Sequence, residues 1–190
     1  MRILLIGAPG SGKGTQALRI AEHYGITHIS SGDLLRKHVS EDSNIGRSVR
    51  AYVDRGDLVP DALVMDMLRK PVIAANDSGG YVLDGFPRTV QQAKAAYEIA
   101  RGLGVSVRIA VYLDVPTEDL VDRLLARGRG SEDSADVIKH RLEVFHEHTI
   151  PMLDYYGSRE ELVKIDGSHP PDDVTALVFA ELDQFRRTPD

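Results

Sequence analysis

The sequence predicts an α/β domain built around a doubly wound, parallel sheet of about five strands. Short apolar runs alternate along the chain with longer segments of helical periodicity, and this alternation is typical of parallel sheets. The runs are continuously apolar rather than alternately apolar and polar, as expected of strands covered on both faces. The five predicted strands are Arg2–Ile6, Thr27–Ile29, Tyr81–Leu83, Val107–Leu113 and Leu162–Ile165.

Eight helices are predicted between and after these strands. Several begin with residues that favour a helix start: Thr117 precedes two acidic residues, and Asp61 and Asp172 each follow a proline. Such starts place the helices between strands, as a doubly wound sheet requires. The predicted helices are Lys13–Tyr24, Leu34–Ser40, Ile45–Arg55, Asp61–Ala75, Val90–Leu103, Thr117–Ala126, Asp136–Tyr156 and Asp172–Phe185.

Two stretches break the regular alternation. The block Ser30–Ala75 is rich in helical patterns and contains no strand, so its front part is interpreted as an insertion. The segment Arg127–Ser134 is polar and interrupted by glycine, so we expect a mobile surface segment that buries nothing.

Composition and charge exclude several classes of protein. The 190 residues include 42% hydrophobic and 27% charged residues, as is ordinary for a globular domain, and the net charge is −6. A sequence-independent nucleic-acid binder normally carries a basic surplus, so no nucleic-acid partner is expected. The absence of cysteine excludes disulfides, thiolate zinc sites and cysteine nucleophiles. No apolar run approaches the ~20 residues of a membrane helix, and the first run is too short for a signal peptide. A cytoplasmic location without a membrane partner follows as the expectation.

A glycine-rich loop follows the first predicted strand and opens the first predicted helix. Its sequence, GAPGSGKGT, runs from Gly7 to Thr15. Glycines in this position let backbone N–H groups turn inward at a helix N-terminus and bind phosphate, and Lys13 would reach the outer phosphates. The general pattern has Ser or Thr directly after the lysine, whereas Gly14 stands here and Thr15 follows. The alternative is a glycine-rich turn without a ligand.

Further charged residues fall where a nucleotide site would need them. Asp84 ends a predicted strand at the edge where magnesium or its bound water would be held, with Asp33 and Thr15 as other candidates for that shell. Arg88 follows a rigid Phe-Pro pair, which aims its guanidinium into the site. Phosphoryl transfer needs cations around the developing charges more than an acid–base pair. Arginines at helix ends or beside the irregular segments are Arg36, Arg88, Arg123, Arg127, Arg129 and Arg141.

Five ordered motifs together closely resemble the adenylate kinase family, from Met1 to about Val174. The motifs are GAPGSGKGTQ (7–16), SSGDLLR (30–36), GDLVPD (56–61), DGFPRTVQQA (84–93) and DRLLARGR (122–129). The resemblance implies a P-loop nucleoside monophosphate kinase fold, in which one kinase domain has a core, a subdomain that binds the nucleoside monophosphate, and a short lid. The corresponding ranges are 1–29, 60–125 and 137–190 for the core, 30–59 for the binding subdomain and 126–136 for the lid.

The same resemblance implies a monomeric enzyme that catalyses Mg²⁺-dependent transfer between nucleotides, ATP + AMP ⇌ 2 ADP. It implies no zinc, because a lid without cysteine cannot form the zinc site of long-lid relatives. The residues that match the family's catalytic cations are Lys13, Arg88, Arg123, Arg129 and Arg141. Those that match its ATP site are Gly10, Ser11, Gly12, Lys13, Gly14, Thr15, Arg123, Arg127 and Gly167. Those that match its AMP site are Ser31, Arg36, Asp57, Leu58, Val59, Gly85, Phe86, Pro87, Arg88, Gln92, Arg129 and Arg141.

Gln92 also has a physical role to play in base selection. Its amide can accept from the adenine amino group and donate to ring N1, a pairing that guanine would reverse. Ser31 stands where the family more usually has threonine, so base selectivity could loosen slightly. Either Glu132 or Asp133 could pair with the lid arginines. Two alternatives remain: a UMP/CMP kinase on the same fold, against which Gln92 argues, and a non-catalytic ATP/AMP-binding module, against which Lys13, Asp84 and Arg88 argue.

Overall fold

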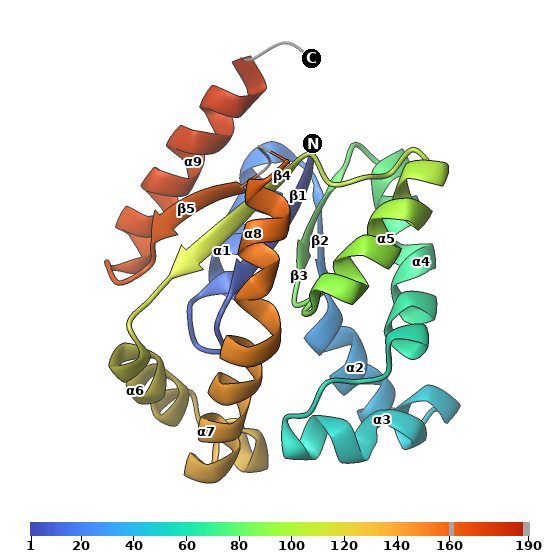
Figure 1. Cartoon of the computed structure of the whole chain (residues 1–190), viewed down its shortest axis with the longest axis vertical. Helices are drawn as coiled ribbons and strands as arrows, with labels where there is room; N and C mark the ends of the chain where they lie inside the picture. Colours follow the sequence, from blue (N-terminus) through green and yellow to red (C-terminus); the bar gives the residue numbers. More distant parts are fainter. Residues whose placement is uncertain (160–161, 188–190) are drawn as a thin grey trace.

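A five-stranded parallel sheet forms the centre of the molecule (Figure 1). The computed structural model describes residues 1–159 and 162–187. The strand order is β2-β3-β1-β4-β5, and every neighbouring pair is parallel. The predicted sheet is therefore confirmed. The strands are β1 (Arg2–Gly7), β2 (Thr27–Ser30), β3 (Tyr81–Asp84), β4 (Ile109–Asp114) and β5 (Leu162–Asp166).

Strand β1 lies in the middle of the sheet and is buried on both faces. Leu4 and Ile6 join the apolar core on one face, and Ile3 and Leu5 join the core on the other. Successive side chains of a strand point to opposite faces, so a strand covered on both sides must be apolar throughout. This explains why the strands appear in the sequence as continuous apolar runs.

Helices cover both faces of the sheet. On one face, α1 (Lys13–Tyr24) and α9 (Pro171–Arg187) pack against the sheet through Ile20 and Val178. The larger core on the other face is covered chiefly by α4, α5 and α8, of which α8 crosses in front of the sheet in Figure 1. No helix within the described ranges is both long and apolar enough to cross a membrane. The remaining helices are α2 (Ser31–Ser40), α3 (Asn44–Arg55), α4 (Asp61–Asp77), α5 (Val90–Gly102), α6 (Thr117–Arg127), α7 (Ala135–Val144) and α8 (Pro151–Gly157).

The prediction of one continuous helix over Asp136–Tyr156 is wrong. After α7 the chain forms η2 (Phe145–Thr149), a stretch of π-helix, before α8 begins. The backbone N–H of Ile150 donates to the carbonyl oxygen of Phe145 at 3.1 Å, one residue further back than in an α-helix. Pro151 explains the break because it has no N–H to continue the ladder and is tolerated in a first turn.

The expectation that the segment Arg127–Ser134 buries nothing is also wrong. It contains η1 (Gly130–Asp133), a short 3-10 turn, and the Asp133 side chain is only 1% exposed. A buried carboxylate is costly unless it is paired and hydrogen-bonded. Here the guanidinium of Arg127 and the backbone N–H of Arg129 both donate to Asp133, which compensates the burial.

The block between β2 and β3 contains only helices among its elements, as predicted. Its first two, α2 and α3, lie beyond the carboxyl ends of the strands (Figure 1). The N-cap Ser43 accepts from the N–H of Gly46 at 3.0 Å, and the two helices meet where Gly46 faces the backbone of α2. A Cβ at Gly46 would lie 1.9 Å from the carbonyl oxygen of His38, so only glycine fits there.

We expect Gly46→Ala to destabilise the protein by about 2–3 kcal/mol, because the new methyl group must push α2 and α3 apart. The measurement is urea unfolding of the variant beside the wild type. Gly102→Ala is the matched control, since a Cβ at that helical glycine meets open space and alanine favours helix. Equal stability of the two variants would contradict the close α2–α3 packing.

Candidate functional site

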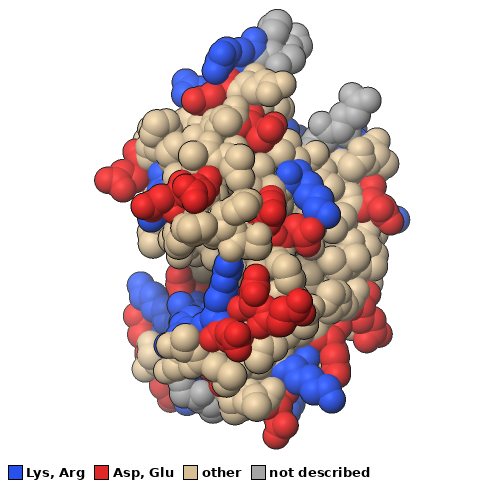
Figure 2. Space-filling view, turned by 90° about the vertical axis from the view of Figure 1, so that its left-hand side faces the viewer, with Lys and Arg blue, Asp and Glu red and all other residues tan. Residues whose placement is uncertain are grey.

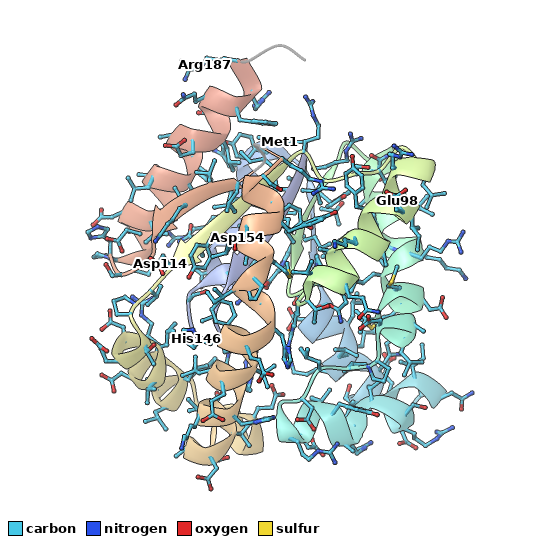
Figure 3. The ribbon with its side chains drawn as sticks, in the orientation of Figure 1. Met1, Glu98, Asp114, His146, Asp154 and Arg187 are labelled. Atoms are coloured by element: carbon cyan, nitrogen blue, oxygen red, sulfur yellow. The ribbon has the colours of Figure 1, made fainter. Side chains whose placement is uncertain are left out.

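The candidate site lies at the carboxyl edge of the sheet, between α2–α3 on one side and α6–α7 on the other (Figure 1). Ligands of open parallel sheets bind at this edge. Figure 2 shows a hollow on one face of the molecule with Lys and Arg side chains gathered beside it. In Figure 3, Met1, which precedes β1, lies at the amino ends of the strands, and Asp114, which ends β4, lies at their carboxyl ends.

The glycine-rich loop joins β1 to α1 and has the backbone of a phosphate cradle. Gly10 and Gly12 have φ angles of 86° and 91°, in the left-handed region that favours glycine, and Gly12 caps α1. The first turn of a helix leaves its N–H groups without partners within the helix. Lys13 folds back over the loop, and its Nζ donates to the carbonyl oxygens of Gly7 at 2.8 Å and Ala8 at 2.9 Å. The buried Oγ of Ser11 has no partner among the described residues.

Lys13 lies in an environment that disfavours its charge. Burial lowers the pKa of its ammonium group from 10.5 to about 8. Asp84 acts in the opposite direction, and Arg88 and Arg141 lower the pKa further. Lys13 is therefore close to losing its proton in the ligand-free protein, and an anion beside it would restore the ordinary charge.

Two arginines converge on the same place. Arg88 is held by its own Nε, which donates to the carbonyl oxygen of Gly85 at 2.7 Å, and by Thr149, whose hydroxyl donates to the Arg88 carbonyl oxygen at 2.8 Å. Burial lowers the pKa of Arg88, and burial together with Arg88 and Arg127 lowers the pKa of Arg141 to about 10. Both guanidinium groups stay charged at neutral pH, so the site holds positive charge in excess.

Two pockets meet at these arginines. The first contains most residues matched to the AMP site; the second contains Lys13 and Pro87. Both are lined by Gly85, Arg88 and Arg141, so a group bound in one would face a group bound in the other across these residues. The predicted residues in the first pocket are Ser31, Arg36, Asp57, Leu58, Val59, Gly85, Phe86, Arg88, Gln92 and Arg141.

Ser31 and Gln92 are buried polar side chains in the first pocket. Ser31 is 1% exposed, and its Oγ has no partner within the described part of the chain. A Cβ at Gly85 would lie 2.6 Å from that Oγ, so the glycine makes room for the hydroxyl group. Gln92 is 2% exposed and follows the N-cap Thr89, whose hydroxyl accepts from the Gln92 N–H. Buried polar atoms in a pocket wall are suited to bind a polar ligand.

The acidic residues of η1 divide between the arginines. Asp133 binds Arg127 in a bidentate pair, with distances of 2.9 Å to Nε and 2.5 Å to the terminal nitrogen, and this hydrogen bonding lowers the pKa of Asp133. Glu132 lies 3.4 Å from Arg36 and 3.7 Å from Arg141. Asp133 therefore pairs chiefly with Arg127, and Glu132 lies between Arg36 and Arg141. The sequence alone had left this pairing open.

Outside the two pockets lie Arg123, Arg127, Arg129, Gly167 and the loop residues Gly10, Ser11, Gly12, Gly14 and Thr15. Arg123 donates to the carbonyl oxygens of Gly167 at 3.1 Å and Ser168 at 3.2 Å, so the two residues matched to the adenine of ATP are in contact. Arg129 has an exposed side chain near the charges of Arg127 and Arg36, and it lines neither pocket.

Among the three magnesium candidates, Asp84 fits best. It is 8% exposed, and its Oδ2 lies 4.0 Å from where a Cβ at Gly14 would stand, beside the phosphate loop. Thr15 is exposed, and Asp33 is 62% exposed and paired with Arg36 at 2.5 Å. Mg²⁺ is usually held by one or two carboxylates together with substrate phosphates and water. Asp84, a buried carboxylate beside the phosphate loop, fits such a donor set.

Sequence reasoning missed Thr149, which holds the backbone of Arg88, and His140, whose Nε2 lies 2.7 Å from Oδ1 of Asp57. Thr149 is 6% exposed and belongs to the π-helical stretch. Pro151, two residues later, was the available signal, because a proline inside a helical pattern marks a local break where a side chain can be redirected.

Comparisons with known proteins point in one direction. A family model for adenylate kinase matches residues 5–161. The chain is 44% identical over 181 residues to a protein named "Adenylate kinase" from Synechococcus sp. (strain WH7803), covering 95% of this chain and 98% of that protein. It is 42% identical over 181 residues to "Adenylate kinase 1" from Nostoc sp. (strain PCC 7120), covering 95% and 98%. It is 40% identical over 190 residues to "Adenylate kinase" from Trichodesmium erythraeum (strain IMS101), covering 97% and 99%.

We expect the affinity for tripolyphosphate to fall about tenfold between pH 7 and pH 9. Lys13 is protonated below its pKa of about 8 and neutral above it, so the attraction for the anion is present at pH 7 and lost as the pH rises. Calorimetry at both pH values measures the change. In Lys13→Met the binding should be weaker at pH 7 and vary less with pH, and an identical pH dependence in both proteins would refute the role of Lys13.

Proposed function

The chain belongs to the adenylate kinase family, and we propose that it transfers the terminal phosphoryl group of ATP to AMP where its two pockets meet. It is a nucleoside monophosphate kinase, a phosphotransferase that acts on adenine nucleotides. What remains to be assigned is which residues carry each part of the reaction, and the geometry of the site supports a specific assignment.

One observation carries the proposal: Lys13, Arg88 and Arg141 converge beside Arg36 and Arg127, and these five cations outnumber the three carboxylates that act on the first three, Asp84, Glu132 and Asp133. Each has a pKa lowered first by burial, and each of the three is affected by the charge of at least one neighbouring cation. Such a site is stabilised when a polyanion enters. Phosphoryl transfer develops charge on three equatorial oxygens, and preorganised cations at that position stabilise the transition state.

The reaction is a direct, in-line displacement without a phosphoenzyme. A phosphate oxygen of AMP attacks the γ-phosphorus of ATP, the bond to the β–γ bridging oxygen breaks, and two ADP molecules result. Lys13 follows the transferred group, while Arg88 and Arg141 hold it between the two pockets. Asp84 is the residue that would hold Mg²⁺, which supplies further charge neutralisation when bound with ATP. The enzyme contributes mainly position and charge.

The two nucleotides are assigned to opposite sides of this centre. AMP occupies the first pocket, with Arg36 near its phosphate and Gln92 at its base. ATP places its phosphates on the loop Gly10–Thr15, and its adenine lies against Arg123 and Gly167. Arg127 reaches the phosphates through the N–H groups that Asp133 leaves free, and Arg129 does so as the lid moves.

The proposal also includes the division into parts and the setting of the enzyme. Residues 30–59 form the AMP-binding subdomain and residues 126–136 the short lid. Contacts of Glu132 with Arg36 and Arg141 support a closed arrangement of the two. We further propose a cytoplasmic monomer without a nucleic-acid or membrane partner, consistent with the net charge of −6.

The first test measures ADP formation from MgATP with AMP, CMP, UMP and GMP in parallel. We expect turnover with AMP far above the others, because the buried amide of Gln92 pairs with adenine but meets the reverse pattern on guanine and uracil, and cytosine has one ring fewer to bury in the pocket. A preference for CMP or UMP would indicate a pyrimidine monophosphate kinase. Binding of ATP and AMP by calorimetry without any ADP would indicate a non-catalytic module.

We expect Arg88→Lys to keep the fold and to lose at least ~100-fold in turnover, since a point charge replaces a planar fork of donors. The measurement is kcat with saturating MgATP and AMP, beside the thermal unfolding temperature. Arg101→Lys is the control, because Arg101 is exposed at the end of α5. Near-normal turnover in Arg88→Lys would rule out the role given to this residue.

A further inference from the structure

Gln92 is a buried amide in the proposed AMP pocket, and its neighbours hold the amide in a single orientation. The backbone N–H of Arg88 donates to Oε1 of Gln92 at 2.8 Å. The Nε2 of Gln92 donates to Oδ1 of Asp61 at 2.7 Å. An N–H group can only donate and a carboxylate only accepts, so these two neighbours determine which end of the amide is oxygen and which is nitrogen.

Each end of the amide still has one hydrogen-bonding position for a ligand. An amide oxygen can accept twice and an amide nitrogen can donate twice, and the two contacts use one of each. Because Gln92 lines the pocket together with Ser31 and Arg88, the remaining acceptor and donor are available to a base. A 6-aminopurine offers a donor at N6 and an acceptor at N1, which match them. A 6-oxopurine offers the reverse.

To bind a 6-oxopurine the amide would have to turn by 180°. Its NH₂ group would then face the N–H of Arg88, and its oxygen would face the carboxylate of Asp61. Both contacts become repulsive, and the one with Asp61 involves a full charge, which makes it the stronger of the two. Discrimination that comes from repulsion against the wrong ligand adds to discrimination from attraction of the right one.

We propose that Asp61 is a specificity-determining residue that locks the amide of Gln92 in the orientation that selects 6-aminopurine over 6-oxopurine monophosphates. Asp61 does not line the pocket among the described residues, so it acts as a positioning residue through Gln92. It begins α4, two residues after Val59, which lines the pocket, whereas Gln92 lies in the first turn of α5. This inference rests on the proposed function, in which the first pocket takes the acceptor nucleotide.

The test compares kcat/KM for AMP and for IMP at saturating MgATP in the wild type and in Asp61→Asn. IMP differs from AMP at N1 and C6 only, so the comparison isolates the orientation of the amide from the size of the base. The asparagine side chain can either accept or donate, so it tolerates both orientations of Gln92. We expect the AMP:IMP ratio to fall about tenfold, through a higher KM for AMP and improved use of IMP, with the KM for ATP unchanged.

Asp66→Asn is the matched control, because Asp66 is an exposed residue on the same helix and loses the same charge. Its AMP:IMP ratio should equal that of the wild type. Asp61→Ser provides a second variant that removes the charge while keeping a hydroxyl group that can accept or donate, should the asparagine variant fold poorly. A purely structural role of Asp61 would reduce activity with both nucleotides alike and leave the ratio unchanged.

The outcomes separate this inference from the proposed function. A lower AMP:IMP ratio in Asp61→Asn or Asp61→Ser, with the ratio of Asp66→Asn unchanged, supports the role of Asp61 in fixing the Gln92 amide. If the wild type prefers AMP and the Asp61 variants keep the same AMP:IMP ratio, the role of Asp61 is refuted while the proposed function stands. If the wild type uses AMP and IMP equally, both the role of Asp61 and the assignment of Gln92 to base selection are refuted.

Discussion

The site depends on like charges held close together against their own repulsion. Lys13, Arg88 and Arg141 converge at the junction of the pockets, and each has a lowered pKa because burial and neighbouring cations disfavour its charge. The fold maintains this arrangement with backbone contacts: Lys13 donates to two loop carbonyls, and Arg88 is held through Gly85 and Thr149. The guanidinium of Arg88 is thus in position before a polyphosphate binds, and a preorganised charge needs little rearrangement.

The carboxylates around these cations have separate tasks. Asp84 is buried beside the phosphate loop and opposes the loss of charge at both Lys13 and Arg88. Glu132 and Asp133 instead lie in η1, where they connect arginines from different elements. Glu132 links α2 to α7, because it lies near both Arg36 and Arg141. The three acidic residues thus position the cations but are too few to neutralise all of them.

Contacts between segments far apart in the chain bring the two sides of the site together. His140 in α7 lies 2.7 Å from Asp57 at the end of the α2–α3 insertion, and hydrogen bonds from Arg55 and His140 lower the pKa of Asp57. Together with the contact between Glu132 and Arg36, this joins the α2–α3 insertion to η1 and α7, the proposed AMP-binding part to the proposed lid. Side chains that meet across such a boundary are positioned by both segments at once.

The sequence by itself determined the sheet and the phosphate loop, because both depend on local pattern. A strand buried on both faces must be apolar throughout, and a loop that turns its N–H groups toward phosphate needs glycine at Gly10 and Gly12. Most residues that the five motifs match to the AMP site also line one pocket. Only the tertiary structure decided the burial of Asp133, the π-helical break before Pro151, and the contacts of Arg88 with Thr149 and of Gln92 with Asp61. These depend on which distant polar groups meet once the helices pack, and no local period or spacing encodes such pairings.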